Sequence, residues 1–70
     1  MSTLVKVIEV IAQSDKGFTE AVRNGVAEVS KTVKGVKAVW VDNFTCMVEG
    51  GEITQFRANV KVSFQVEGHQ

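Results

Sequence analysis

Residues 53 to 66 read ITQFRANVKVSFQV, and from position 54 onward mostly apolar side chains alternate with polar ones. Alternation with a period of two over this length is typical of a long β-strand with one buried face and one polar face. The side chains predicted to share the buried face are Thr54, Phe56, Ala58, Val60, Val62, Phe64 and Val66.

The dipeptide Gly50-Gly51 precedes this stretch and follows another extended segment, Val36 to Val48. Two glycines between β-type segments predict a two-residue hairpin turn of the primed type, which requires positive φ. If Glu49 faces Glu52 across the turn, the numbers of paired residues sum to 101. The expected pairs on one face are Val41 with Val60 and Val39 with Val62; those on the other are Trp40 with Lys61, Asp42 with Asn59, Phe44 with Arg57, and Cys46 with Gln55.

The first part of the chain predicts a strand followed by a helix. Leu4 to Ile11 is β-branched and nearly all apolar, which favours a strand covered on both faces. Either Ser14 or Asp15 is a suitable helix N-cap, and Gly35 is a suitable C-cap, with Lys31 and Lys34 expected in the last turn. The predicted helix has one apolar stripe, and Gly25 within it suggests a close approach to the sheet; the stripe residues are Phe18, Ala21, Val22, Val26, Val29 and Val33.

The element order is therefore β-α-β-β in a single α+β domain over residues 1–70. A right-handed crossover makes the first two strands parallel, so placing the third between them gives a three-stranded antiparallel sheet of order 1-3-2. A 14-residue strand spans about 46 Å, whereas a helix of about 18 residues spans about 27 Å. One helix cannot cover such a sheet, and a chain this small is expected to gain its remaining stability from oligomerisation.

Composition excludes several classes of function. Eight basic and eight acidic side chains leave no net charge, which argues against nucleic-acid binding. A single cysteine, Cys46, and a single histidine, His69, provide no internal disulfide, no zinc site of the His/Cys type and no catalytic set, so we expect a protein that is not an enzyme. With no signal-peptide pattern and no membrane-spanning run, the expected location is the cytoplasm, without membrane contact.

Several ordered segments resemble those of the dodecins, small flavin-binding proteins that assemble as hollow shells of twelve identical chains. The resemblance covers nearly the whole chain, and it implies a homododecamer that binds flavin at subunit interfaces for storage or sequestration, without turnover. The matching segments are VKVIEVI at 5–11, Ser14-Asp15, SKTV at 30–33, EGGEITQFR at 49–57 and VKVSFQVE at 60–67.

The resemblance also indicates cofactor-binding positions, and this chain departs from the family pattern at each. The tryptophan that stacks on flavin in the flavin-binding members corresponds to Ala38, although Trp40 lies two residues later on the same face. A hydrogen-bonding glutamine corresponds to Arg57, and two arginines correspond to Thr45 and Gln65. We therefore expect weak binding of FMN, riboflavin or FAD.

Alternatives remain for these residues. Trp40 either stacks on a flat ligand or packs in a subunit interface. Arg57 either binds a ligand phosphate or carboxylate, or forms a salt bridge or a cation–π contact with Phe44. Cys46 is interpreted as a small apolar filler. Calcium bound by Asp42, Glu49 and Glu52 in a flavin-free shell is the alternative function, and a cofactor-dependent enzyme is a more distant one.

Overall fold

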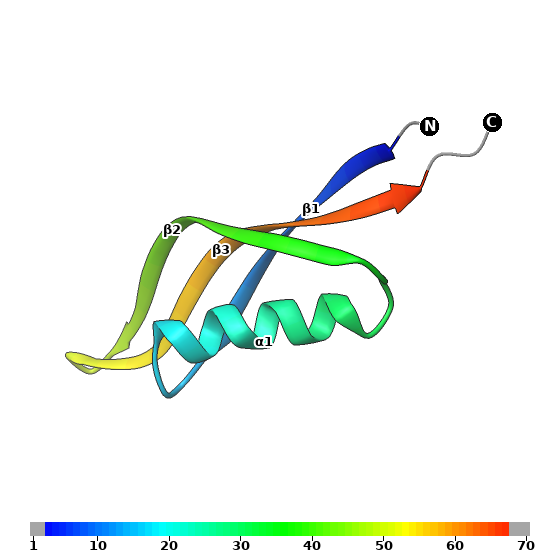
Figure 1. Cartoon of the computed structure of the whole chain (residues 1–70). Coiled ribbons are helices and arrows are strands. Elements are labelled where there is room, and N and C mark those ends of the chain that lie inside the picture. The colour runs from blue at the N-terminus through cyan, green and yellow to red at the C-terminus, as the bar shows by residue number, and fades with distance from the viewer. Residues whose placement is uncertain (1–2, 68–70) are drawn as a thin grey trace.

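The computed structural model describes residues 3–67, which form one helix and three strands. β3 lies between β1 and β2 and is antiparallel to both, so the predicted order 1-3-2 is confirmed. The helix lies against one face of this sheet (Figure 1). The elements are β1 at Thr3–Ser14, α1 at Phe18–Ser30, β2 at Val36–Glu49 and β3 at Glu52–Glu67.

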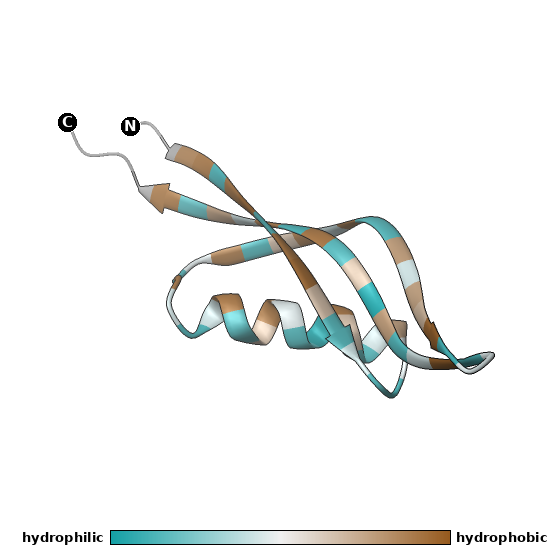
Figure 2. Ribbon diagram, turned by 180° about the vertical axis from the view of Figure 1, so that it is seen from behind, coloured by the Kyte–Doolittle hydropathy of each residue, from teal (hydrophilic) through white to brown (hydrophobic). Residues whose placement is uncertain are grey.

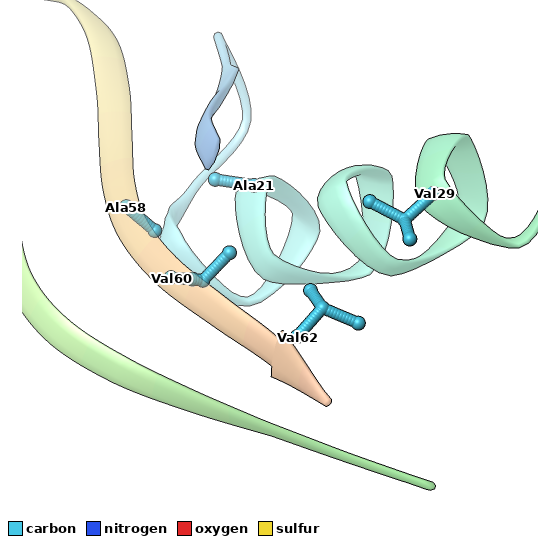
Figure 3. Close-up of a cluster of buried hydrophobic side chains, with 5 residues drawn as sticks. All are labelled: Ala21, Val29, Ala58, Val60 and Val62. Atoms are coloured by element: carbon cyan, nitrogen blue, oxygen red, sulfur yellow. The ribbon is translucent and has the colours of Figure 1, made fainter. Parts of the chain in front are cut away.

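The core lies between α1 and the middle of β3. Val60 and Val62 are completely buried, and both side chains point toward α1 (Figure 3). The helix contributes Ala21 and Val29 to the same cluster. We call this side of the sheet the helix face, and the register places on it Ile8, Val10 and Ala12 of β1, Val39, Val41 and Phe44 of β2, and Ala58, Val60 and Val62 of β3.

Gly25 allows α1 to approach the sheet, as the sequence predicted. A methyl group built at its Cα would lie 3.1 Å from Cβ of Ala12 and 3.6 Å from Cγ2 of Val60. Contacts this short leave little space for any side chain at position 25. The glycine therefore lowers intrinsic helix propensity by about 1 kcal/mol relative to alanine but permits close packing of α1 against β1 and β3.

The start of α1 differs from the prediction that Ser14 or Asp15 would cap it. Gly17 is the N-cap residue, and no side chain donates or accepts a capping hydrogen bond there. Ser14 ends β1 instead, and its Oγ accepts a hydrogen bond from the backbone N–H of Lys16 at 2.9 Å. This hydrogen bond stabilises the turn between strand and helix. A hydroxyl that is bound within the turn is not available to cap the helix.

The end of α1 also differs from the prediction. The helix stops at Ser30 with Lys31 as C-cap, so neither Lys31 nor Lys34 lies in its last turn, and Gly35 is not its cap. Gly35 has φ of 81° and joins the turn to β2, where its carbonyl accepts a hydrogen bond from the N–H of Gln65 at 3.0 Å. Gly35 therefore belongs to the beginning of the pairing between β2 and β3. The helix ends before it and has 13 residues.

The hairpin between β2 and β3 has the predicted turn. Gly50 and Gly51 have φ of 58° and 80°, and Glu49 faces Glu52. Two positive φ values in succession are characteristic of the primed turn. The predicted pairs of Trp40 with Lys61, Val41 with Val60 and Val39 with Val62 are also confirmed; they are Cα partners in the register.

Three register shifts interrupt the pairing of β2 with β3. They lie between Met47 and Val48, between Val41 and Asn43, and between Val36 and Ala38. A β-bulge places two residues of one strand opposite one residue of its partner. Every β2 residue between two bulges therefore lies on the opposite face of the sheet from the one that a regular register would give it. The predicted pairs in that region were therefore wrong by one: Phe44 faces Ala58, Thr45 faces Arg57, Cys46 faces Phe56, and Asn43, not Asp42, faces Asn59.

Phe44 consequently lies on the helix face, where it packs against the start of α1. Its ring centroid is 4.4 Å from that of Phe18, and Phe56 meets Phe18 edge-on at 5.1 Å. Without the shift after Val41, Phe44 would lie on the opposite face, away from Phe18. The three aromatic rings close the end of the core near the hairpin, which is a physical reason for the bulge.

The sheet extends past α1 at both ends. The molecule is 56 Å long, whereas 13 helical residues span about 20 Å. The hairpin tip extends beyond one end of α1, and the paired ends of β1 and β3 extend beyond the other (Figure 1). No helix within residues 3–67 is long and apolar enough to cross a membrane.

The other side of the sheet, which we call the open face, is covered by no helix or strand within residues 3–67. Figure 2 shows apolar and polar bands alternating along β3, as expected when successive side chains point to opposite faces. Val5 and Ile11 are 67% and 65% exposed, so the expectation that this strand is covered on both faces is not met within one chain. The open face consists of Val5, Val7, Glu9, Ile11 and Gln13 of β1, Ala38, Trp40, Asn43 and Thr45 of β2, and Arg57, Asn59, Lys61, Ser63 and Gln65 of β3.

Candidate functional site

Trp40 is the aromatic side chain of the open face. It lies opposite Lys61, which in turn lies opposite Glu9 of β1. The side chain is 46% exposed. The ring–ring contacts among residues 3–67 all involve Phe18, so Trp40 has no aromatic partner there. Its ring is accessible to a planar ligand or to a second chain, and both predicted roles remain open.

Thr45, Arg57 and Gln13 form one transverse row on the same face. The Nε–H of Arg57 donates a hydrogen bond to Oε1 of Gln13 at 2.9 Å. The predicted cation–π contact between Arg57 and Phe44 is wrong, because the register shift moves Phe44 to the helix face. The predicted salt bridge is also absent from the described residues, in which the only ion pair joins Lys31 and Glu28.

Ala38 and Gln65 lie toward the other end of the open face. Ala38 faces Ser63, whose hydroxyl donates to the carbonyl of Ala38 at 3.4 Å. Gln65 faces Val5 and borders a shallow groove together with Gly35 and two lysines. Along β3, Arg57 and Gln65 are eight residues apart, which corresponds to about 26 Å.

The five predicted binding residues therefore share a face without forming a single pocket. Ala38 and Trp40 are neighbours on that face, whereas Thr45 and Arg57 form a separate pair nearer the hairpin. Gln65 lies one row beyond Ala38. A ligand that contacted all of them would have to extend along most of the sheet, or lie between residues of different chains.

Asn59 is the notable residue of this face that sequence reasoning missed. It lies at the centre of the open face, between Ile11 of β1 and Asn43 of β2. Its Oδ1 is buried and has no hydrogen-bond partner among the residues that the structure describes. An unsatisfied buried acceptor costs about 1–3 kcal/mol, so a donor that reached this oxygen after a turn of the side chain would remove that cost. The sequence offered no signal, because an asparagine in a polar row is ordinary.

The calcium alternative has no support in the described part of the chain. Residues 3–67 contain no group of three or more His, Cys, Asp or Glu side chains able to hold a metal ion. Glu49 and Glu52 face each other at the turn, whereas Asp42 lies at the register shift between Val41 and Asn43. His69 lies outside the described residues. Cys46 is partly buried opposite Phe56, in keeping with its interpretation as a filler.

Comparison with known proteins gives one consistent relationship. The family model described as Dodecin matches residues 4–67. The dodecin from Streptomyces coelicolor is 27% identical, with 96% of each chain covered and a TM-score of 0.90. The dodecin from Streptomyces davaonensis is 22% identical over 97% of this chain and 100% of its own, also with a TM-score of 0.90.

The tt0972 protein from Thermus thermophilus has the same fold at lower similarity. It is 18% identical, with 97% of this chain and 100% of its own chain covered and a TM-score of 0.91. No curated protein matches the sequence. Together these comparisons confirm the predicted fold across nearly the whole chain.

Proposed function

Because this chain belongs to the dodecin family, we propose that it binds flavin without catalysis, storing or sequestering it in a cytoplasmic homododecamer. The observation that carries the proposal is the exposed ring of Trp40 on an uncovered sheet face, close to the unsatisfied Oδ1 of Asn59. An isoalloxazine ring has a planar aromatic surface for Trp40 and an imide N–H that can donate a hydrogen bond to Oδ1 of Asn59 when that side chain turns toward the ligand. The residues present therefore fit the group.

Trp40 and Asn59 are close enough to contact one ligand. Trp40 faces Lys61, and Asn59 precedes Lys61 by two residues in β3, on the same face. Diagonal neighbours of this kind lie about 7–8 Å apart, within reach of an aromatic side chain. In this proposal Trp40 provides the stacking surface and Asn59 the acceptor, whereas Ala38 provides no stacking. Affinity is accordingly expected to be weaker than in members with tryptophan at that position.

The open face also supports assembly. It exposes Val5, Val7 and Ile11 on one edge strand and Trp40 on the other, with the polar row of β3 between them and exposed fractions from 46% to 67%. Exposed apolar area of this kind favours association, which removes it from water. Sedimentation or native mass spectrometry is expected to give twelve chains per particle. A stable folded monomer at micromolar concentration would contradict the assembly.

A flavin titration tests the ligand. Since Trp40 is the only tryptophan, its fluorescence reports binding at this face directly, and we expect FMN to quench it. Trp40→Ala is expected to weaken FMN binding about tenfold or more, because stacking contributes about 1–3 kcal/mol, and Trp40→Phe should retain part of it. Flavin's own fluorescence measures binding to the variants.

Two outcomes would contradict this arrangement. Tight binding that is indifferent to Trp40→Ala would place the ring elsewhere on the protein. Absence of quenching at high micromolar FMN would favour the alternative, a structural shell without flavin. This alternative is supported by Ala38, which stands where the flavin-binding members have the stacking tryptophan.

A further inference from the structure

The tip of the β2–β3 hairpin is an exposed segment that combines apolar and acidic side chains. Val48 and Ile53 are partners across the hairpin and are 59% and 54% exposed. Glu49 and Glu52 face each other beside the turn, and both are exposed. Like charges directly opposite each other on a sheet repel, so a cationic partner would stabilise this arrangement. Within residues 3–67 no ion pair involves either glutamate.

Two exposed lysines border a groove at the opposite end of β2, where the chain passes from α1 into this strand (Figure 1). Lys34 and Lys37 line this groove together with Gly35 and Gln65. Neither lysine forms an ion pair within residues 3–67. The sequence adds one acidic residue at this end, Glu67, two positions beyond Gln65, so the groove keeps an excess of positive charge.

Lys37 also borders a second groove, which lies between α1 and β2. The other residues that line it are all apolar: Val26 of α1, and Val36, Ala38 and Val39 of β2. Because both grooves include Lys37, we describe them as one basic–apolar groove. It matches the hairpin tip in both respects, since it offers apolar surface for the tip's apolar pair and positive charge for its glutamates.

We infer that the hairpin tip of one copy docks in the basic–apolar groove of a second copy, with the apolar pair against its apolar part and the glutamates against its lysines. The inference rests on the assembly part of the proposed function. A chain cannot fill its own groove, because tip and groove lie at the two ends of β2, a strand of 14 residues and about 46 Å. The contact is therefore head to tail, and it closes into a ring in a finite particle.

An exchange of charges tests this contact. Glu49→Lys combined with Glu52→Lys makes the tip repel the groove. Lys34→Glu combined with Lys37→Glu has the same effect from the other side. Because like charges across an interface repel, each double variant should need about tenfold more protein for half of the chains to assemble. The fourfold variant, which combines all these substitutions, restores opposite charges and should return to within about threefold of wild type.

Sedimentation velocity and native mass spectrometry measure the assembly, and circular dichroism checks that each variant is folded. The matched control is Asp15→Lys combined with Glu20→Lys, which changes the net charge as much as the tip variant does, at exposed positions outside the tip and the groove. It should assemble like the wild type. Raising NaCl from about 50 to about 500 mM should narrow the difference between wild type and double variants, because salt screens exposed charges.

Recovery of assembly in the fourfold variant would support the contact, because it requires the tip and the groove to meet directly. The contact is wrong if both double variants assemble like the wild type, or if the fourfold variant assembles no better than either of them. In those cases a wild-type particle that binds flavin leaves the proposed function intact. A wild type that remains a folded monomer would instead overturn both this contact and the proposed assembly.

Discussion

The two faces of β3 are made from alternate residues of one strand, yet the side chains of one face are buried and paired much more completely than those of the other. On the helix face, Ala58, Val60 and Val62 are fully buried and their neighbours fill the space beneath α1. On the open face, Asn59 has an unsatisfied carbonyl oxygen and Arg57 has no carboxylate partner within the described residues. The helix face therefore stabilises the fold of one chain, whereas the open face contributes less to it and leaves this oxygen without a hydrogen-bond partner and this guanidinium without a counterion among residues 3–67.

The largest difference between the faces should appear when a charge is placed on each. Val60→Asp buries an unpaired carboxylate at a fully buried position, and we expect loss of the folded state at neutral pH, since such a group costs several kcal/mol or more. The matched control is Lys61→Asp, one residue along and on the open face, which should still fold. Circular dichroism and urea unfolding measure both. Equal losses would show that the two faces contribute alike to folding.

The comparison also shows what the alternating pattern can predict. The period of two in residues 53–66 and the Gly50-Gly51 turn together define the strand order and the pairs at Val60, Lys61 and Val62. These features depend on many side chains at once, because a slip of one residue would expose the whole apolar set. A prediction that rests on such a pattern tolerates errors at single positions.

The bulges and the helix ends could not be predicted in this way. The bulge between Val41 and Asn43 has no glycine to mark it. It is favoured by the packing of Phe44 against Phe18, a contact between residues far apart in sequence. The predicted pairs at the site show the same effect. The pair of Trp40 with Lys61 was correct because it lies outside the shifted segment, whereas the pair of Thr45 with Arg57 was not predicted.

A smaller effect is expected at the hairpin, which both faces share. Gly50→Val places a β-branched residue at φ of 58°, a conformation that costs about 1–3 kcal/mol for residues other than glycine. We expect a lower thermal midpoint and poorer assembly, and the same for Gly51→Val at φ of 80°. Gly50→Asn is the control, because asparagine tolerates positive φ. Unchanged stability of both valine variants would mean that the turn has another conformation.

The smallest change in stability, with a clear change in binding, is expected at Asn59. Asn59→Leu removes an acceptor that has no partner within residues 3–67, so the free energy of unfolding without flavin should stay within about 1 kcal/mol of wild type or rise slightly. Flavin then loses the acceptor for its imide N–H, and both FMN and riboflavin should bind about tenfold more weakly. Thermal unfolding with and without each flavin measures the two effects together.

The matched control for that experiment is Asn43→Leu, since Asn43 faces Asn59 across the strand pair but has no unsatisfied buried atom. It should leave flavin affinity close to wild type. If Asn59→Leu instead destabilised the flavin-free protein by more than about 2 kcal/mol, its Oδ1 would already have a partner in solution, such as an ordered water or a second chain. Such a result would make Asn59 part of the assembly, and the imide acceptor would have to be sought in another residue near Trp40.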